Sequence, residues 1–239
     1  MPLKEIAERR NLLHRKSDAQ TILKHVLTDV ELGKIALVSS FGAEAVVLLH
    51  MVSEIDKNTP VIFLETEMLF PETLSYQREI SAQLGLTDVR VIGPDRADVL
   101  EQDVDGILHQ ADTDACCNLR KTQPLARALA EFDGWITGRK RYQGGQRAQL
   151  PLFEKEDNKI KVNPLADWTA QDLQDYMTDH NLPRHPLVAK GYPSIGCMPC
   201  TSRVSDHEDP RAGRWRDSDK TECGIHFKDG KVVRSGQAA

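Results

Sequence analysis

The stretch Lys34-Ile35-Ala36-Leu37-Val38-Ser39-Ser40-Phe41-Gly42-Ala43-Glu44 decides the fold of this chain. Its first six residues form a short apolar run with the composition of a buried strand. A glycine-containing turn follows, and an apolar helical stretch then continues from Ala43 to about Ile55. This order of strand, glycine turn and helix is typical of a phosphate-binding site, because backbone N–H groups and the helix N-terminus face the anion.

Strands and helices alternate along the rest of the first 180 residues. Further strands are predicted at residues 60–64, 89–92, 135–138 and 159–162. Helices are predicted over residues 3–32, from Phe70 onward, between the third strand and about His109, over 116–132 with a kink or restart at Pro124, and over 167–180. This alternation predicts an α/β fold with a parallel sheet flanked by helices.

Ligands of parallel sheets bind beyond the carboxyl ends of the strands. Residues 39–42, 64–66 and 137–141 all fall at such ends. We therefore expect one crevice to collect these three segments.

The composition fits one domain with a small appendage. The chain has 239 residues, 40% of them hydrophobic, and a net charge of −5, so neither three domains nor a disordered chain is expected. We predict an α/β domain with an N-terminal helix over residues 1–180. Residues 181–239, in which Pro, Gly, Arg and Asp dominate, are expected to form a mostly irregular C-terminal segment.

Nothing in the sequence indicates a membrane protein. No apolar run approaches the roughly 18 residues that a spanning helix needs, and the N-terminus lacks the layout of a signal peptide. We expect a soluble, cytoplasmic protein with no membrane partner.

The distribution of charge indicates a small anionic ligand. The mildly acidic total argues against nucleic-acid binding. One stretch nevertheless holds seven basic residues and only two acidic ones: Arg120, Lys121, Arg127, Arg139, Lys140, Arg141 and Arg147 against Glu131 and Asp133. A local basic cluster on an acidic protein suits a small anion. A solvated helix face remains the alternative interpretation.

Four of the five cysteines form two close pairs, Cys116-Cys117 and Cys197-Met198-Pro199-Cys200. Without a signal peptide a disulfide framework is not expected. Two pairs of thiolates suit a tetrahedral metal ion or an iron–sulfur cluster. Adjacent cysteines are unusual for zinc, whose ligand pairs are mostly separated by two to four residues, so the pattern favours an iron–sulfur cluster. Buried structural thiols are the alternative.

The fifth cysteine, Cys223, has the features of a reactive thiol. It lies three residues before His226 and follows Arg211, Arg214, Arg216 and Lys220, all of which can lower a thiol pKa. An exposed thiol of low pKa is a nucleophile. An inert cysteine near the C-terminus is the alternative.

Six motifs in order resemble one known family. They are Cys116-Cys117-Asn118-Leu119-Arg120-Lys121, Trp135-Ile136-Thr137-Gly138-Arg139-Lys140-Arg141-Tyr142-Gln143, Asn163-Pro164-Leu165-Ala166-Asp167-Trp168, Gly191-Tyr192-Pro193-Ser194-Ile195-Gly196-Cys197-Met198-Pro199-Cys200-Thr201, Arg211-Ala212-Gly213-Arg214-Trp215 and Glu222-Cys223-Gly224-Ile225-His226. Over roughly residues 33–228 the chain resembles assimilatory adenylyl-sulfate reductases of the iron–sulfur type, in the phosphoadenylyl-sulfate reductase family.

The resemblance implies an adenine nucleotide α-hydrolase-like fold and a two-step reaction. The Cys223 thiolate would attack the sulfur of adenosine 5′-phosphosulfate, AMP would leave, and a thiosulfonate would remain on Cys223. Thioredoxin or a related thiol reductant would then release sulfite and restore the thiol. This places the reaction in assimilatory sulfate reduction and cysteine biosynthesis, and we expect a homo-oligomer.

The same resemblance implies the roles of individual residues. Cys223 is the expected catalytic residue, and the expected ligands of a four-iron, four-sulfur (4Fe-4S) cluster are Cys116, Cys117, Cys197 and Cys200. The expected substrate-binding residues are Lys121 between cluster and substrate, Arg147, Arg211, Arg214 and His226 beside the phosphosulfate or the active thiol, Ser39 and Gly42 in the phosphate-side loop, and Leu64, Thr137 and Gly138 in the nucleotide pocket.

The turn after Ser39 departs from the patterns of relatives in two ways. It lacks the double glycine and the final serine of the S-G-G-x-D-S loop of ATP-cleaving relatives, and Ala45 offers no hydroxyl, so ATP hydrolysis is disfavoured. Many reductases carry Ser where this chain has Phe41, and Asp where it has Ala45. Either Ser40 supplies the loop-side hydrogen bond to the substrate or that bond is absent.

Three other functions remain as alternatives. The first keeps the fold and uses the 3′-phosphorylated substrate, whose extra phosphate calls for another basic residue. The second is a zinc-stabilised binding module, which predicts a colourless protein and no role for Cys223. The third is a tRNA-thiolating relative, which would need the ATP loop that this chain lacks.

Overall fold

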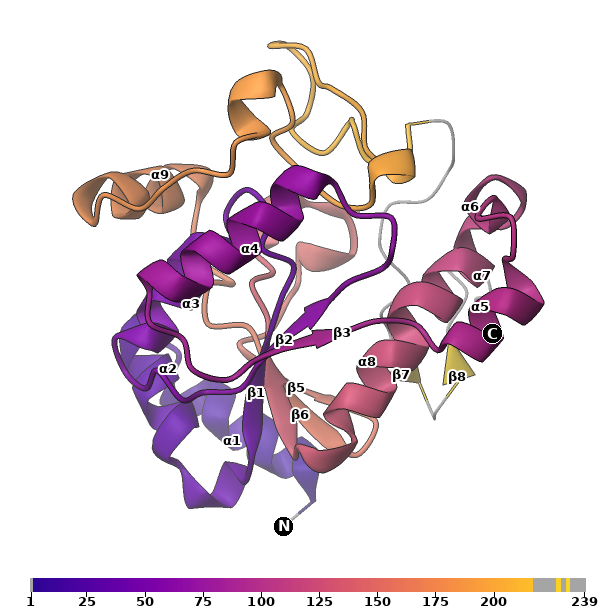
Figure 1. Cartoon of the computed structure of the whole chain (residues 1–239). Helices are drawn as coiled ribbons and strands as arrows, with labels where there is room; N and C mark the ends of the chain where they lie inside the picture. Colours follow the sequence, from indigo (N-terminus) through magenta and orange to yellow (C-terminus); the bar gives the residue numbers. More distant parts are fainter. Residues whose placement is uncertain (1, 217–226, 229–230, 233–239) are drawn as a thin grey trace.

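The computed structural model describes residues 2–216, 227–228 and 231–232, except for the side chain of Gln146 and those of the last four residues. Its centre is a six-stranded sheet in the order β3-β2-β1-β4-β6-β5 (Figure 1). The strands are β1 (Ile35–Ser39), β2 (Val61–Leu64), β3 (Val89–Ile92), β4 (Gly134–Ile136), β5 (Phe153–Glu156) and β6 (Lys159–Val162). All neighbouring pairs are parallel except β5 with β6. The predicted α/β fold with a mainly parallel sheet is confirmed.

Helices cover both faces of the sheet. They are α1 (Leu3–Leu13), α2 (Ala19–Thr28), α3 (Ala45–Ser53), α4 (Pro71–Gln83), α5 (Arg96–Gln102), α6 (Leu108–Ala111), α7 (Thr113–Cys117), α8 (Gln123–Ala128) and α9 (Ala170–Asp179). Helices α2, α3 and α4 lie on one side of the sheet and α8 on the other (Figure 1). Side chains alternate along β1 accordingly: Leu37 packs with the first group of helices, and Ala36 packs beside Leu125 of α8.

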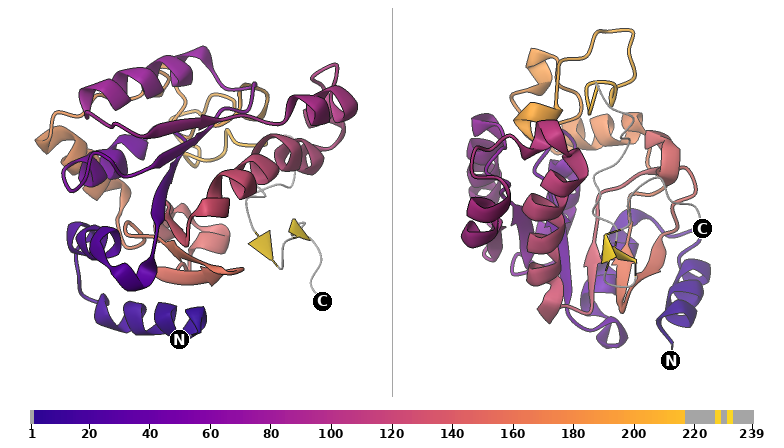
Figure 2. Two further views of the ribbon diagram at one scale, coloured as in Figure 1. Left: turned by 60° about the horizontal axis from the view of Figure 1, so that its bottom comes forward. Right: turned by 90° about the vertical axis from the view of Figure 1, so that its right-hand side faces the viewer.

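The helix expected over residues 3–32 is two helices and a short 3₁₀ turn (Val30–Leu32). The break occurs because Asp18 starts a new helix: its carboxylate accepts a hydrogen bond from the Thr21 backbone N–H at 2.7 Å. Helix α1 packs along β5 (Figure 2), where the side-chain amide of Asn11 bonds both the N–H and the carbonyl of Phe153. This contact covers β5, which is an edge strand. The sequence did not predict β5, because its residues Phe153-Glu154-Lys155-Glu156 are mostly polar.

A π-helical turn (Asn118–Thr122) connects α7 to α8. The Gln123 backbone N–H bonds the carbonyl of Asn118, five residues earlier, immediately before Pro124. Proline has no N–H and crowds the preceding turn, so the wider turn occurs where the sequence predicted a kink or restart. The Arg120 and Lys121 side chains of this turn are both buried.

The C-terminal segment crosses the carboxyl edge of the sheet. Its described residues from 181 to 216 are mostly irregular, with two 3₁₀ turns, Val188–Lys190 and Met198–Cys200. The Met198 N–H bonds the carbonyl of Met68 at 2.7 Å, which ties the segment to the loop after β2. Strands β7 (Phe227–Lys228) and β8 (Lys231–Val232) form a separate small hairpin. The boundary at residue 180 remains a prediction.

In the described part of the chain, no helix combines the length and the apolarity that crossing a membrane requires.

A buried histidine makes the stability of the fold depend on pH. His185 is 1% exposed, its Nδ1 accepts from the Leu187 N–H, and its Nε2 lies 3.1 Å from the Thr73 hydroxyl. Burial lowers the pKa of His185 from 6.5 to about 4. Below pH 6.5 the unfolded chain therefore binds a proton that the folded chain excludes, and the free energy of unfolding falls as the pH falls.

We expect His185 to cost the fold about 3 kcal/mol of stability between pH 6.5 and pH 4. His185→Gln should flatten this part of the stability curve, measured by urea unfolding at a series of pH values. His207→Gln, at an exposed position, is the matched control and should leave the curve unchanged. Equal slopes for wild type and His185→Gln would contradict the prediction.

Candidate active site

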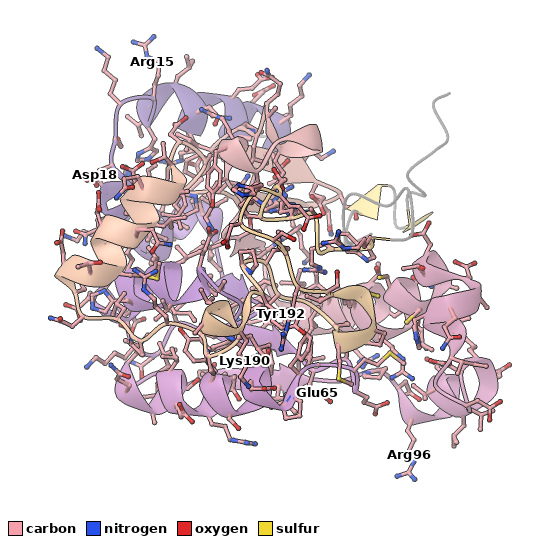
Figure 3. All side chains as sticks on the ribbon, turned by 90° about the horizontal axis from the view of Figure 1, so that it is seen from above. Arg15, Asp18, Glu65, Arg96, Lys190 and Tyr192 are labelled. Atoms are coloured by element: carbon pink, nitrogen blue, oxygen red, sulfur yellow. The ribbon has the colours of Figure 1, made fainter. Side chains whose placement is uncertain are left out.

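A cavity of about 330 Å³ opens at the carboxyl edge of the sheet, where the strand order reverses between β1 and β4. Its walls come from the turn after β1, the ends of β2 and β4, the π turn and the C-terminal segment. Figure 3 looks onto this edge from above, with the segment that carries Lys190 and Tyr192 crossing the centre of the view. The crevice expected at the three strand ends is therefore present.

The cavity brings together the described members of the predicted binding set. These are Ser39, Gly42, Leu64, Lys121, Thr137, Gly138, Arg147, Arg211 and Arg214. Cys197 also lines the cavity. Cys223 and His226 lie outside the described residues, so their predicted roles stay predictions. Residues from five separate parts of the sequence thus share one site.

The turn after β1 is held by its own side chains. The Phe41 N–H donates to Ser39 Oγ at 3.2 Å, and the Gly42 N–H lies 3.4 Å from Ser40 Oγ. Phe41 has a φ of +48°, a strained value for a bulky residue, and its fully buried ring packs edge-on against Phe63. Phe41, which replaces the serine of many reductases, therefore packs in the core. Ser40 lines the cavity together with Ser39.

One end of the cavity is apolar. Val38, Leu64, Leu125 and Trp135 line it, and they belong to the small core between the sheet and α8. A wall of aliphatic and aromatic side chains suits an apolar, planar ring. Thr137 follows Trp135 by two residues, so its side chain points to the same face of the sheet.

Basic side chains dominate the polar lining, and three of them are paired with carboxylates. Arg139 pairs with Glu154, Lys140 with Glu44 at 2.7 Å, and Lys161 with Glu156. Burial lowers the pKa values of Lys140 and Lys161, although the neighbouring carboxylates oppose this effect. These pairs hold the walls in place.

The basic cluster read from the sequence divides into two groups. Lys121, Arg139, Lys140 and Arg147 line the cavity. The other three make contacts elsewhere: Arg120 pairs with Asp103, Arg127 donates to the Gly93 carbonyl, and Arg141 pairs with Asp167. Because several of these side chains are buried, the alternative of a solvated helix face is wrong.

The C-terminal segment contributes Arg211 and Arg214 from above the sheet. The Arg214 guanidinium lies 4.4 Å from the centre of the Trp215 ring. It also presses against Gly196, where an added Cβ would lie 2.2 Å from Nη2 of Arg214. The buried Nε of Arg214 has no hydrogen-bond partner among the described residues. Arg214 is thus a cation beside the cavity, with one donor that no group in the described part of the chain uses.

The two cysteine pairs converge next to this site. Cys116, Cys117 and Cys197 are buried, and Cys200 is half-buried. The Thr66 hydroxyl lies 3.2 Å from the Cys197 sulfur. Burial, followed by the nearby charge of Cys197, raises the pKa of Cys116 to about 11, and Cys200 acts in the same direction. Both cysteines of the second pair thus act electrostatically on Cys116.

This environment suits thiolates that are bound to iron. Among the described residues no three His, Cys, Asp or Glu side chains converge on the position of a single metal ion. A cubane cluster instead takes one thiolate on each of four irons. A buried thiol with a raised pKa, as at Cys116, needs nearby positive charge to exist as a thiolate, and the iron atoms of a cluster would supply that charge. The four cysteines thus fit the predicted 4Fe-4S cluster.

Arg120 connects the cysteine helix to the loop after β2. Its guanidinium binds Asp103 through two nitrogens at 2.9 and 3.1 Å, and it donates to the Thr66 carbonyl and to Glu67. Asp103 is itself buried, so this pair is isolated from solvent. The Arg120 charge lowers the pKa of the Cys116 thiol and opposes part of the effect of burial.

The model of the phosphoadenosine phosphosulfate reductase domain matches residues 34–203. The chain belongs to this family. An adenosine 5′-phosphosulfate reductase of Mesorhizobium japonicum is 55% identical over 194 residues, which cover 81% of this chain and 76% of the relative. A phosphoadenosine 5′-phosphosulfate reductase of Gloeobacter violaceus is 40% identical over 198 residues, 81% of this chain and 82% of the relative.

Solved structures agree with this reductase family. The phosphate complex of the phosphoadenylyl-sulfate reductase from Candida auris superposes with a TM-score of 0.69 at 26% identity, covering 84% of this chain and 97% of that one. The FMN adenylyltransferase of Candida glabrata has a TM-score of 0.55 at 14% identity, covering 98% and 85% of the two chains, and shares the fold alone. The predicted nucleotide α-hydrolase-like architecture is confirmed.

Several lining residues were absent from the predicted set. Among them are Glu44, Lys161 and Trp215. Glu44 ends the stretch 34–44 and Trp215 ends the motif 211–215, and position within these stretches was the available signal. Lys161 is a charged residue in a strand, and its cavity position follows from its register opposite Trp135 on β4.

Proposed function

We propose that this member of the reductase family converts adenosine 5′-phosphosulfate to sulfite and AMP. The observation that carries the proposal is a cavity at the β1–β4 reversal, which has an apolar end of Leu64, Leu125 and Trp135 and a polar end lined with Lys and Arg. That combination suits a nucleotide bearing a phosphosulfate. The 55% identical relative carries the name of this activity.

The chemistry proceeds through the Cys223 thiolate. Its sulfur attacks the sulfur of the phosphosulfate, the S–O bond to phosphate breaks, and AMP leaves with both bonding electrons. A thiol of thioredoxin, or of a related reductant, then attacks Cys223 Sγ, sulfite leaves, and the second thiol of the reductant releases Cys223 as a disulfide forms. Two electrons thus pass from two thiols to the substrate sulfur.

The basic residues act on the charge that moves in the first step. Arg147, Arg211 and Arg214 lie on the cavity wall, where they can hold phosphate and sulfate oxygens. Lys121 is 8% exposed and lines the same cavity. We propose that Lys121 stabilises the negative charge that develops on the bridging and terminal oxygens of the phosphosulfate. His226 is proposed to sit beside the Cys223 thiol.

A 4Fe-4S cluster would be held by Cys116, Cys117, Cys197 and Cys200. When bound it would join the two cysteine pairs, and its iron atoms would supply the positive charge that stabilises the four thiolates. The thiols already provide both electrons, so we propose a structural and electrostatic role for the cluster. The reaction would serve assimilatory sulfate reduction and cysteine biosynthesis in the cytoplasm, in a homo-oligomer whose segment 181–239 brings Cys223 to the α/β domain.

The 3′-phosphorylated nucleotide is the second candidate substrate, because relatives of both names match this chain. The experiment is anaerobic sulfite release with thioredoxin, comparing adenosine 5′-phosphosulfate with its 3′-phosphorylated form at equal concentration. We expect strong preference for the first. Comparable turnover of both would keep the mechanism and withdraw the specificity. Turnover of neither by brown protein would contradict the proposed reaction.

A further inference from the structure

Asn163, behind the nucleotide end of the cavity, is fully buried and makes an unusually complete set of hydrogen bonds. Its Nδ2 donates to the Pro151 carbonyl at 2.9 Å and to Glu154 Oε1 at 3.0 Å. Both partners are acceptors only, so the amide can have just one orientation. Oδ1 must therefore be the atom that faces Thr137.

The Thr137 hydroxyl donates to this Oδ1 at 2.6 Å. A threonine hydroxyl has a single hydrogen, and here Asn163 takes it. The oxygen keeps two lone pairs, of which one accepts from Arg139 Nε at 3.3 Å. Since Thr137 lines the cavity, its oxygen can offer a ligand only an acceptor.

We propose that Asn163 is a positioning residue of the nucleotide site, which fixes the Thr137 oxygen as an acceptor that reads an N–H or O–H donor of the nucleoside. The proposal rests on the proposed function, because it takes the ligand to be an adenine nucleotide. The donor is the 6-amino group of the base or a ribose hydroxyl. Asn163 touches no ligand itself and acts through Thr137.

The backbone supports the same geometry. The Thr137 N–H bonds the Val162 carbonyl at 2.8 Å, and the Asn163 N–H bonds the Leu152 carbonyl at 2.7 Å. The ends of β4, β6 and β5 are thus joined around one side-chain amide. The position of Thr137 and the role of its oxygen as an acceptor are therefore set before a ligand binds. This lowers the entropy that is lost on binding.

The test measures dissociation constants of the whole protein by calorimetry, for AMP and for analogues that lack one donor each: inosine 5′-monophosphate, 2′-deoxy-AMP and 3′-deoxy-AMP. In the wild type we expect the analogue that lacks the donor facing Thr137 to bind about 5- to 10-fold more weakly than AMP. The analogue that shows this loss identifies the donor. If no analogue shows it, Thr137 reads no donor and the proposal is overturned.

Variants then assign the discrimination to the two residues. Thr137→Val should bring the ratio for that analogue close to one, whereas Thr137→Ser should keep it. Asn163→Ala frees the hydroxyl to rotate, so the same ratio should fall although Thr137 is intact. Thr59→Val, at a buried threonine that is not among the cavity residues, is the matched control and should keep the wild-type ratio.

The ratio of the analogue and AMP affinities is measured on the same variant, so a smaller fraction of folded protein affects both affinities and leaves their ratio unchanged. If Asn163→Ala does not fold, the wild-type protein still tests whether the Thr137 hydroxyl is fixed as an acceptor. Where the 6-amino group is the donor, inosine 5′-monophosphate is the probe, because a freely rotating hydroxyl would donate to O6 of inosine and bind this nucleotide as well as AMP. Where a ribose hydroxyl is the donor, 2′- or 3′-fluoro-deoxy-AMP is the corresponding probe. Equal affinities would overturn the role of Asn163. If Thr137→Val still releases sulfite and keeps the wild-type ratio of analogue to AMP affinity, this inference is overturned but the proposed reaction stands.

Discussion

Cys223→Ser is expected to reduce sulfite release from adenosine 5′-phosphosulfate by more than about 1,000-fold. A serine hydroxyl in the same place has a far higher pKa than a thiol and is a much poorer nucleophile at neutral pH. It also cannot form the thiosulfonate from which a reductant releases sulfite. The measurement is anaerobic turnover with thioredoxin, together with mass spectrometry of the protein after incubation with substrate.

The contrasting variant is Cys197→Ser, which alters a buried thiol of the proposed cluster rather than the proposed nucleophile. Cys223→Ser should keep the brown colour and the affinity for AMP, whereas Cys197→Ser should lose the colour. A Cys223→Ser protein that still releases sulfite would show that the nucleophile is misassigned. Wild-type protein that is colourless after anaerobic purification would favour the zinc-stabilised alternative.

Lys121→Ala is expected to slow formation of the Cys223 thiosulfonate by about 100- to 1,000-fold. The lysine is buried on the wall of a cavity that Cys197 also lines, so its charge acts in a region from which water is largely excluded. Removing it should raise the energy of the transition state, in which negative charge grows on the leaving phosphate. Single-turnover sulfonation, followed by mass spectrometry, measures this step without the reductant.

The readout that separates catalysis from structure is the visible absorbance of the cluster, which Lys121→Ala should leave unchanged. Lys16→Ala, at an exposed lysine between α1 and α2, is the matched control and should sulfonate at the wild-type rate. Unchanged sulfonation in Lys121→Ala would remove the electrostatic role. Loss of absorbance would show that the lysine mainly supports the cysteines.

The parts of the fold that are marked by local patterns were predictable. The apolar run before Ser39 became β1, and the proline after Phe70 opened α4, because strand burial and helix starts depend on residues within a few positions. β5 was missed because its residues are polar and only the Asn11 contacts complete its edge. The single N-terminal helix was wrong because the Asp18 cap starts a second one.

The residue types of the candidate site could also be predicted from the sequence. Two cysteine pairs, a glycine turn after a strand and clustered basic residues each indicate a chemistry through their spacing alone, because thiolates, backbone N–H groups and cations bind few kinds of ligand. Family membership followed from the same motifs. None of these patterns required knowledge of distant contacts.

Which of these groups act together was decided by the tertiary structure. The parallel strands place residues 39–42 and 137–138 at one edge, and the C-terminal segment adds Arg211 and Arg214 across it. The charge of Lys140 is committed to Glu44, 96 residues earlier in the chain, a pairing that no spacing rule predicts. The single hydrogen of Thr137 is committed to Asn163, 26 residues away. Hydrogen bonding and burial are properties of neighbours in space, so they emerge only when the sheet has brought these residues together.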